Sequence, residues 1–175
     1  GQFAMVEVPD KFLRRPISVS SYDSSRYTLI YKVVGEGTDI MSRMEPGDYV
    51  KGITGLGNGY DLDKIPDGAY LIGGGIGIPP MLGLLKAMVM AGKSCKMVLG
   101  YNSADEMFML EDFEHFSDDI TVMTADGSYG QKGFVTDAFD KCEYACACGP
   151  LPMLRALDHK VERGQFSLEA RMGCG

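Results

Sequence analysis

The chain has 175 residues, which is enough for one large domain or two small ones. Its net charge of -7, without any cluster of Lys and Arg, argues against nucleic acid as a partner. No apolar run approaches the ~20 residues of a membrane span, so we expect no membrane association. The five cysteines do not form a secreted disulfide pattern, which favours a reducing, cytoplasmic location.

The first third of the chain is rich in short extended segments. Turn residues separate these segments, and Thr38 is placed to cap a short helix over 39–44. Three or four strands are too few to close a barrel, so we expect a partial β barrel with exposed edges. The predicted strands are Phe3–Val8, Arg15–Val19, Tyr27–Val34 and Tyr49–Thr54.

From Ala69 the pattern changes to alternating strands and helices, after a turn at Pro66-Asp67-Gly68. This alternation predicts an α/β domain with a parallel sheet that is covered on both faces. Ligands in such sheets bind at the carboxyl ends of the strands. We therefore expect a β module over 1–66 and a nucleotide-type α/β module over 67–165. Its strands are predicted at 69–73, 94–100, 119–124 and 143–148, and its helices at 79–91, part of 103–115, 133–139 and 150–163.

The first predicted strand of the α/β module ends in a glycine-rich turn, Gly73–Gly77, followed by Pro79 and Pro80. Glycines allow a ligand to approach the backbone closely, and a helix N-terminus favours a phosphate. The spacing is Gly75-x-Gly77-x-x-Pro80, which departs from the usual G-x-G-x-x-G of dinucleotide sites. By itself this turn is equally compatible with a purely structural strand–helix connection.

Two further groups have a structural and a functional interpretation. Cys142, Cys146 and Cys148 could suggest a metal site, but Cys146 and Cys148 lie within a predicted buried strand, and the paired Cys or His ligands of such a site are missing. We therefore favour buried structural thiols over zinc. Asp126-Gly127-Ser128 follows another strand and is either a ligand contact or an ordinary turn.

Five motifs occur in one order along the chain: Arg15-Pro16-Ile17-Ser18, Gly37-Thr38, the glycine loop 55–59, Gly75-x-Gly77-x-x-Pro80 and Cys148-Gly149-Pro150. In this order they resemble the ferredoxin–NADP reductase superfamily, which pairs a flavin-binding barrel with a pyridine-nucleotide domain. The stretches 13–19 and 167–175 narrow the resemblance to the electron-transfer subunits of NAD-dependent, type B dihydroorotate dehydrogenases. The resemblance covers nearly the whole chain.

The resemblance implies an FAD site in the β module. Arg15 is expected to pair with the FAD pyrophosphate, together with the backbone of Gly37 and the hydroxyl of Thr38. Ser18 is expected near the flavin N5, although Ile17 replaces the aromatic residue that many members of the wider superfamily carry. The residues implied for FAD are Arg15, Pro16, Ile17, Ser18, Tyr31, Lys32, Val33, Gly37 and Thr38.

The resemblance also implies an NAD site in the α/β module. Gly75 and Gly77 are expected against the pyrophosphate or the nicotinamide ribose, and Cys148, Gly149 and Pro150 near the nicotinamide. The acidic stretch 104–106 disfavours the 2′-phosphate of NADP, so NAD is the expected nucleotide.

The resemblance further implies that 166–175 begins a [2Fe–2S] segment, in which Cys174 is the first ligand. One thiolate cannot hold a cluster that takes four ligands, so we expect the cluster only in a longer chain. The implied function is an NAD-linked flavoprotein oxidoreductase subunit in pyrimidine biosynthesis. Electrons from dihydroorotate, which is oxidised by a partner subunit containing FMN, would pass through the cluster and FAD to NAD. The implied assembly has two copies of each subunit.

Two other functions remain open at this point. A related reductase subunit, such as that of a ferredoxin:NADP oxidoreductase, a sulfide dehydrogenase or a hydrogenase, would share the FAD and NAD core. A non-catalytic nucleotide-binding or scaffolding module would keep the fold without the chemistry.

Overall fold

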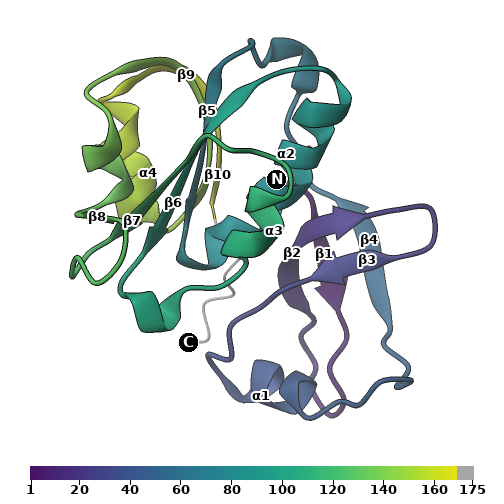
Figure 1. Ribbon diagram of the computed structural model, residues 1–175. Helices are drawn as coiled ribbons and strands as arrows, with labels where there is room; N and C mark the ends of the chain where they lie inside the picture. The colour runs from purple at the N-terminus through teal and green to yellow at the C-terminus, as the bar shows by residue number, and fades with distance from the viewer. Residues whose placement is uncertain (169–175) are drawn as a thin grey trace.

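The computed structural model describes residues 1–168, which form two modules joined side by side (Figure 1). The first module is a four-stranded antiparallel sheet of order β3-β2-β1-β4, with the short helix α1 (Glu36–Ser42) below it. The sheet does not close, as its strand number predicts. Its strands are β1 (Phe3–Val6), β2 (Arg15–Tyr22), β3 (Tyr27–Leu29) and β4 (Gly52–Leu56).

The core of the β module is small. Val6, Val8, Ile17 and Met41 are buried and pack together, which ties β1 and β2 to α1. The strand β4 pairs with β1 but has almost no buried side chain. Most of the stability of this module therefore comes from β1, β2 and their contact with the second module.

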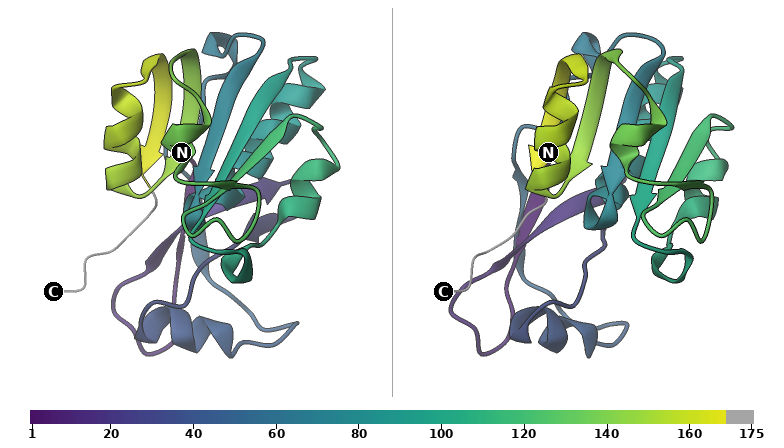
Figure 2. Two further views of the ribbon diagram at one scale, coloured as in Figure 1. Left: turned by 60° about the vertical axis from the view of Figure 1, so that its left-hand side comes forward. Right: turned by 90° about the vertical axis from the view of Figure 1, so that its left-hand side faces the viewer.

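The second module is a six-stranded parallel sheet of order β10-β9-β5-β6-β7-β8 (Figure 2). Its strands are β5 (Ala69–Gly74), β6 (Cys95–Tyr101), β7 (Ile120–Thr124), β8 (Gln131–Lys132), β9 (Cys142–Gly149) and β10 (Val161–Leu168). Its α-helices are α2 (Ile78–Met90), α3 (Leu110–Glu114) and α4 (Leu151–Asp158). Short 3-10 turns lie at η1 (Leu62–Lys64), η2 (Gly75–Gly77), η3 (Ala104–Glu106) and η4 (Val135–Ala138).

Both faces of the parallel sheet are covered, as the strand–helix alternation predicts. Leu71 and Leu99 point into a cluster with α2 and Phe113 of α3. Ile72 and Val98 point to the other face and pack with residues of α4 and η4. Each of these four strand residues is 0–1% exposed, so the apolar runs in β5 and β6 reflect burial on two sides.

The region after α4 differs from the sequence prediction. A helix was predicted over 150–163, but α4 ends at Asp158 and β10 begins at Val161. The register pairs Val161 with Cys142 and Leu168 with Gly149, so β10 continues past the predicted module boundary at 165/166. The prediction was wrong over 159–163 because pairing with β9, a tertiary contact, overrides local helix propensity.

Several other elements are shorter or shifted relative to the prediction, among them β1, which ends at Val6 instead of Val8, and β4, which begins at Gly52 instead of Tyr49. β3 ends at Leu29 instead of Val34, and the following residues leave the sheet. The helix α1 begins at Glu36 instead of Asp39. The helix predicted over 133–139 is only the 3-10 turn η4. Within residues 1–168, every helix is too short or too polar to cross a bilayer.

The connection between the modules is anchored to the parallel sheet. The Tyr60 hydroxyl donates to the Ala147 carbonyl at 3.0 Å. The Lys93 ammonium donates to the carbonyls of Leu62 and Ile65, both at 2.7 Å. These contacts hold the connecting segment against the α/β module.

Candidate functional site

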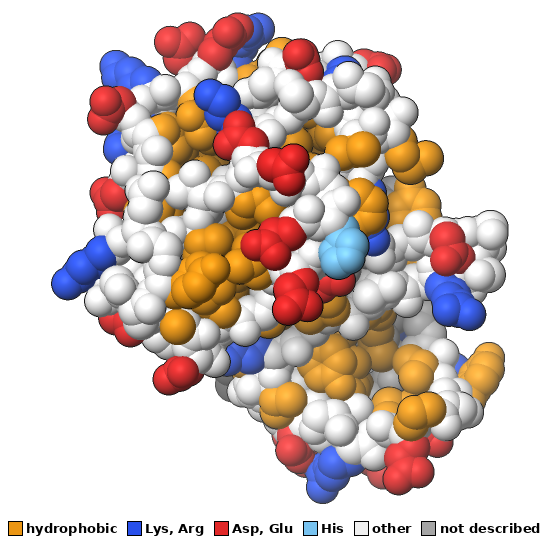
Figure 3. Space-filling model, viewed as in Figure 1, with side chains coloured by type: hydrophobic (Ala, Val, Ile, Leu, Met, Phe, Trp, Pro, Cys, Tyr) orange, Lys and Arg blue, Asp and Glu red, His pale blue; other side chains and the backbone are white. Residues whose placement is uncertain are grey.

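A cavity of about 780 Å³ lies between the two modules. Ile30, Tyr31 and Lys32, which follow β3, form one wall, and Gly74–Ile76 of the glycine turn form another. The space-filling view shows hydrophobic side chains exposed on both modules, including the part of the β module that faces its neighbour (Figure 3). The other lining residues come from the end of β6 and the segment through η3 that follows it, from η4 and the residues before it, and from α4 and the residue before it: Gly100, Tyr101, Asn102, Glu106, Phe108, Gly133, Phe134, Val135, Thr136, Pro150, Pro152, Met153 and Ala156.

The position of the cavity follows from the strand order. β5 lies between β6 and β9, and the connection after β5 covers one face of the sheet while the connection after β9 covers the other. The loops after β5 and β9 therefore diverge, which opens a crevice at the carboxyl ends of these strands. Gly75 and Pro150, one from each loop, both line the cavity.

The glycine turn has two positions with different requirements. Gly75 has φ +52° and no neighbour within 4 Å of the position of a Cβ, so its backbone is left-handed and open. Gly77 has an ordinary helical φ of -79°, but a Cβ there would overlap the carbonyl oxygen of Cys148 and lie 2.6 Å from the Gly149 nitrogen. Gly77 therefore allows the turn after β5 to lie directly against the end of β9.

The residues predicted near the nicotinamide divide into lining and supporting positions. Pro150 lines the cavity, whereas Cys148 is 1% exposed and Gly149 is buried. The Met153 side chain fills the space beside Gly149, where a Cβ would lie 3.0 Å from the Met153 sulfur. Cys148 and Gly149 thus shape the site through the backbone that Gly77 contacts.

The cavity carries charges of both signs. Lys32 lies on the side of the β module, and Glu106 lies on the opposite module. The Asn102 amide donates to the Glu106 carboxylate at 2.9 Å. Burial raises the pKa of Tyr101 to about 12, so its hydroxyl stays protonated and donates to the Phe108 carbonyl at 2.8 Å. The wall after β6 is therefore held in place by hydrogen bonds.

A second group of predicted residues meets at α1, below the cavity. The Arg15 guanidinium lies on the backbone of Gly37, where a Cβ would come within 2.7 Å of Nη2. Arg15 donates to the Leu13 carbonyl at 2.6 Å. Among residues 1–168, no carboxylate forms an ion pair with Arg15. The charge of Arg15 reaches Glu36, whose carboxylate is paired with Lys11, so among the described residues the guanidinium lies beside the first turn of α1 without an ion-pair partner of its own.

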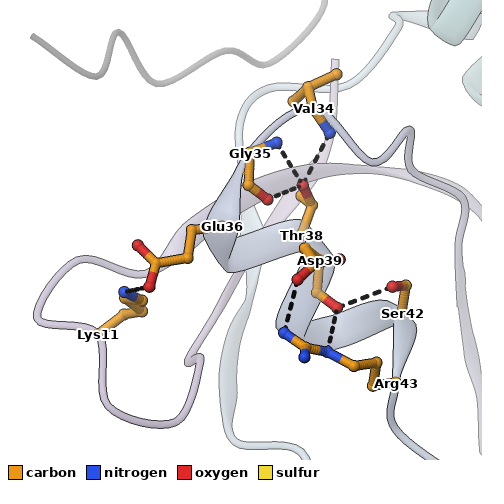
Figure 4. Close-up of polar contacts among 8 residues, drawn as sticks. All are labelled: Lys11, Val34, Gly35, Glu36, Thr38, Asp39, Ser42 and Arg43. Atoms are coloured by element: carbon orange, nitrogen blue, oxygen red, sulfur yellow. Dashed lines mark hydrogen bonds and ion pairs between the residues drawn. The ribbon is translucent and has the colours of Figure 1, made fainter.

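The Thr38 hydroxyl is used by its own helix (Figure 4). It accepts from the nitrogens of Val34 and Gly35 at 3.0 and 3.2 Å and donates to the Gly35 carbonyl at 2.9 Å. Thr38 is therefore the third residue of α1 rather than its cap, which explains the early start of the helix. Hydrogen bonding and the charge of Lys11, 2.5 Å away, lower the pKa of Glu36.

The remaining residues predicted for FAD lie along or after β2 and β3. Pro16 and Ser18 are partly buried on β2, and Ile17 is 6% exposed in the core of the β module. Val33 is 50% exposed and does not line the cavity. The structure thus brings Tyr31 and Lys32 to the cavity and Arg15 to Gly37, while Ile17 belongs to the core.

Asp126-Gly127-Ser128 forms a self-contained turn. The Asp126 carboxylate accepts from the Ser128 nitrogen at 3.0 Å and from its hydroxyl at 2.6 Å, and these bonds lower the pKa of Asp126. The Ser128 hydroxyl accepts from the Ala104 nitrogen at 2.7 Å. These groups are thus used within the fold, and none of the three residues lines the cavity.

Several cavity residues were not predicted from the sequence. Phe108, Phe134 and Met153 carry much of the apolar wall, and Asn102 holds Glu106. Asn102 immediately follows β6, so its place at a strand end was a usable signal. The others depend on where loops and the first turn of α4 fold back, which no local pattern in the chain indicates.

The thiols of β6 and β9 are buried, as the structural interpretation predicts. Within residues 1–168 no group of three or more His, Cys, Asp or Glu could hold a metal ion. Cys174 and the rest of 169–175 lie outside the described residues.

We expect Cys95 and Cys146 to resist alkylation at pH 8. Burial raises their pKa from an ordinary 9.0 to about 11 and about 12. Since both stay protonated in the folded protein, their contribution to stability is present below pH 9 and is lost as pH rises from 9 through the folded pKa values. Peptide mapping after iodoacetamide treatment should show modification of both only after unfolding; rapid labelling of native protein would contradict this.

Comparison with known proteins gives a consistent result. Residues 71–159 match the oxidoreductase NAD-binding domain family. The chain is 41% identical to the dihydroorotate dehydrogenase B (NAD(+)) electron transfer subunit of Fusobacterium nucleatum and 39% identical to that of Bacillus pumilus. Both alignments cover 100% of this chain, and they cover 73% and 72% of those proteins.

Solved structures show the same architecture. An NADH-dependent reduced ferredoxin-NADP oxidoreductase, studied for flavin-based electron bifurcation, superposes with a TM-score of 0.85 at 30% identity, covering 98% of this chain and 66% of that one. Phthalate dioxygenase reductase superposes with a TM-score of 0.71 at 23% identity, covering 95% and 57%. The second likeness concerns the fold alone.

Proposed function

Because the chain belongs to the family of electron transfer subunits of NAD-dependent dihydroorotate dehydrogenase B, we propose that it carries electrons between a catalytic partner and NAD. It is an NAD-linked oxidoreductase subunit. The observation that carries the proposal is the cavity at the carboxyl ends of β5 and β9, which both modules line. A flavin held by one module and a nicotinamide held by the other could meet there.

The residues of the β module fit an FAD site. The cation of Arg15 lies on Gly37 and forms no ion pair among residues 1–168, and Glu36, which its charge reaches, is paired with Lys11, so a pyrophosphate would supply a direct anionic partner. Tyr31 and Lys32 reach the cavity from the same module and would hold the flavin end. Because the Thr38 hydroxyl is already hydrogen-bonded, we assign the anion to Arg15 and to backbone N–H groups near Gly37.

The residues of the α/β module fit NAD. The open, left-handed backbone of Gly75 lets a dinucleotide approach, and Pro150 faces it across the crevice. Gly77, Cys148 and Gly149 act as supports, because the contact of Gly77 with the Cys148–Gly149 peptide sets the distance between the two loops. Glu106 on the cavity wall would repel a 2′-phosphate, which favours NAD over NADP.

When bound, FAD supplies both hydride exchange with NAD and single-electron exchange with an iron–sulfur centre. The protein's own contribution is to orient and shield. Tyr31, Phe134 and Met153 give the cavity an apolar lining, which excludes water from the reacting groups. No general acid or base is required of this chain.

The direction of β10 favours a relay toward a cluster. β10 is parallel to β9, and its last residue, Leu168, pairs with Gly149. The carboxyl end of β10 therefore lies on the same side of the sheet as the cavity, which is at the carboxyl ends of β5 and β9. We propose that the segment from 166 onward leads into a [2Fe–2S] site with Cys174 as one ligand, and that further cysteines complete it. The proposed partner is an FMN-containing subunit that oxidises dihydroorotate, in an assembly with two copies of each subunit.

A second candidate is a related reductase subunit with another electron partner. The superposition with the ferredoxin-NADP oxidoreductase supports this alternative at the level of the FAD and NAD core. The higher identity to the dihydroorotate dehydrogenase B subunits over 100% of the chain favours the first assignment.

The test is a visible spectrum of the full-length protein, recorded without oxygen before and after NADH is added. We expect flavin bands and an iron–sulfur shoulder, and both should bleach with NADH. Addition of the catalytic partner and dihydroorotate should reduce the same centres. A flavin without a cluster signal would support the simpler reductase, and a colourless protein would rule out both candidates.

A further inference from the structure

A close contact between the two modules joins β2 to the first turns of α2. The Ser20 side chain, 1% exposed, donates to the Pro79 carbonyl at 3.0 Å. One turn further along α2, a Cβ on Gly83 would overlap the Ser20 carbonyl oxygen and lie 3.8 Å from the Ser21 Cα. The helix thus lies with its backbone directly on the strand, and the absence of a side chain at 83 allows it.

This contact is connected to both proposed cofactor sites by short, regular stretches of chain. On the strand, Ser20 lies on β2, which begins at Arg15 and includes Ser18. On the helix, Pro79 lies in the first turn of α2, two residues after Gly77 at the end of the glycine turn. A strand and a helix transmit position rigidly, so a shift at the contact moves one site relative to the other.

We propose that the contact of Ser20 with Pro79 and Gly83 positions the flavin side of the cavity against the nicotinamide side. Ser20 and Gly83 are positioning residues and touch neither cofactor. The predicted effect on electron transfer rests on the proposed function. The predicted effect on the distance between the modules does not, because that distance can be measured without cofactors. Reacting groups must approach within about 3–3.5 Å, and a misplacement of about 1 Å can slow a reaction about a hundredfold.

Gly83→Ala is the informative variant because two effects predict opposite results. Helix propensity alone favours alanine over glycine within α2. The contact opposes it, because the new methyl group must push the Ser20 carbonyl away by about 1 Å to reach an ordinary separation near 3.5 Å. A lower melting temperature for Gly83→Ala would therefore show that the helix lies against the strand as described.

The spacing itself can be measured without cofactors. Nitroxide labels on genetically encoded ketone side chains would replace Tyr49 in the β module and Tyr129 in the α/β module, both of which are exposed. Double electron–electron resonance on the full-length protein should show that Gly83→Ala shifts the mean distance between labels by about 1–2 Å. Met90→Ala, at the end of the same helix and 89% exposed, is the matched control and should cause no shift.

The effect on the cofactors is measured separately. Gly83→Ala should slow the reduction of bound flavin by NADH about tenfold to a hundredfold, while the dissociation constants of FAD and NADH change less than threefold. Ser20→Ala, which removes the buried donor to Pro79 without adding bulk, should broaden the distance distribution and slow reduction about threefold to tenfold. If Gly83→Ala does not fold, the label distances and reduction rate of Ser20→Ala test the positioning contact in its place.

Unchanged label distances in both variants would overturn the inference. So would a slower reduction that is explained entirely by weaker FAD or NADH binding. If the wild-type protein binds FAD but NADH does not reduce it, the proposed function fails. The label distances still test the positioning contact in that case, so the two failures are distinguishable.

Discussion

Gly77→Ala is expected to destabilise the protein by about 1–3 kcal/mol and to weaken NADH binding at least tenfold. The backbone of Gly77 is in an ordinary helical conformation that alanine adopts freely, so the cost comes entirely from crowding. The added Cβ would overlap the Cys148 carbonyl oxygen and crowd the Gly149 nitrogen, and both are backbone atoms of a buried strand that cannot rotate away. The loops after β5 and β9 must separate, which deforms the cavity.

Thermal unfolding and NADH titration check this expectation. A loss of about 1–3 kcal/mol in the free energy of unfolding should lower the melting temperature by about 2–12 °C. Gly35→Ala is the matched control, because Gly35 has an extended backbone and no neighbour within 4 Å of a Cβ. It should stay within about 0.5 kcal/mol of wild type. A Gly77→Ala protein with wild-type stability and NADH affinity would show that the two loops do not touch in this way.

Arg15→Ala is expected to weaken FAD binding about 10- to 100-fold. Hydrogen bonds to a charged group contribute about 1.5–3 kcal/mol, and Arg15 is a half-buried cation beside Gly37 that forms no ion pair among the described residues. Retained FAD after desalting, and fluorescence titration of the apoprotein, would measure the loss. Cys148→Ser should retain more FAD than Arg15→Ala, because Cys148 belongs to the α/β module.

Arg14 provides the control within the same segment. Its guanidinium is exposed and pairs with Glu7 at 3.3 Å, a surface ion pair whose contribution is about 0–1 kcal/mol. Arg14→Ala removes the same charge from the neighbouring position and should leave FAD binding nearly unchanged. Equal losses in the two variants would mean that net charge matters, and the assignment of Arg15 to the pyrophosphate would be refuted.

The sequence predicted best those elements whose hydrophobic pattern matches their burial in the folded protein. The apolar runs of β5, β6, β7 and β9 are buried on both faces, so their continuous hydrophobicity identified them to within one residue at most ends. The glycine turn and α2 followed for the same reason, since Gly77 and Pro79 suit a tight turn and a helix start. The incomplete barrel was predictable from strand number alone.

The predictions failed where a distant partner decides the local structure. The segment at Val161 is half polar and became a strand because β9 offers a parallel edge, with Gly164 close to the Ala145 carbonyl. The segment after Leu29 is apolar enough for a strand but leaves the sheet and lines the cavity. Thr38 was predicted to be the N-cap because threonine is common at that position. It lies inside the helix instead, where its hydroxyl accepts a hydrogen bond from the Val34 nitrogen before the helix.

The candidate site was predictable only in part for a related reason. Arg15 and Gly37 were named from motifs, and the structure places them in contact. The apolar wall formed by Phe134 and Met153 comes from loops whose positions depend on the whole sheet. Which residue fills the space beside Gly149 is a matter of packing, and packing has no signature in a single sequence.

The strand order also sets the order of events when the chain folds. Ile72 of β5 pairs with Ala147 of β9, and α2, β6, α3, β7 and β8 all lie between them in the sequence. During synthesis β5 can pair early with β6, but its other edge stays open until β9 emerges, and such long-range parallel pairing is slow. The glycine turn gains its support from Cys148 only at that moment. The nucleotide crevice is therefore expected to be among the last parts of the protein to form, and β5 presents an unpaired apolar edge until β9 emerges from the ribosome.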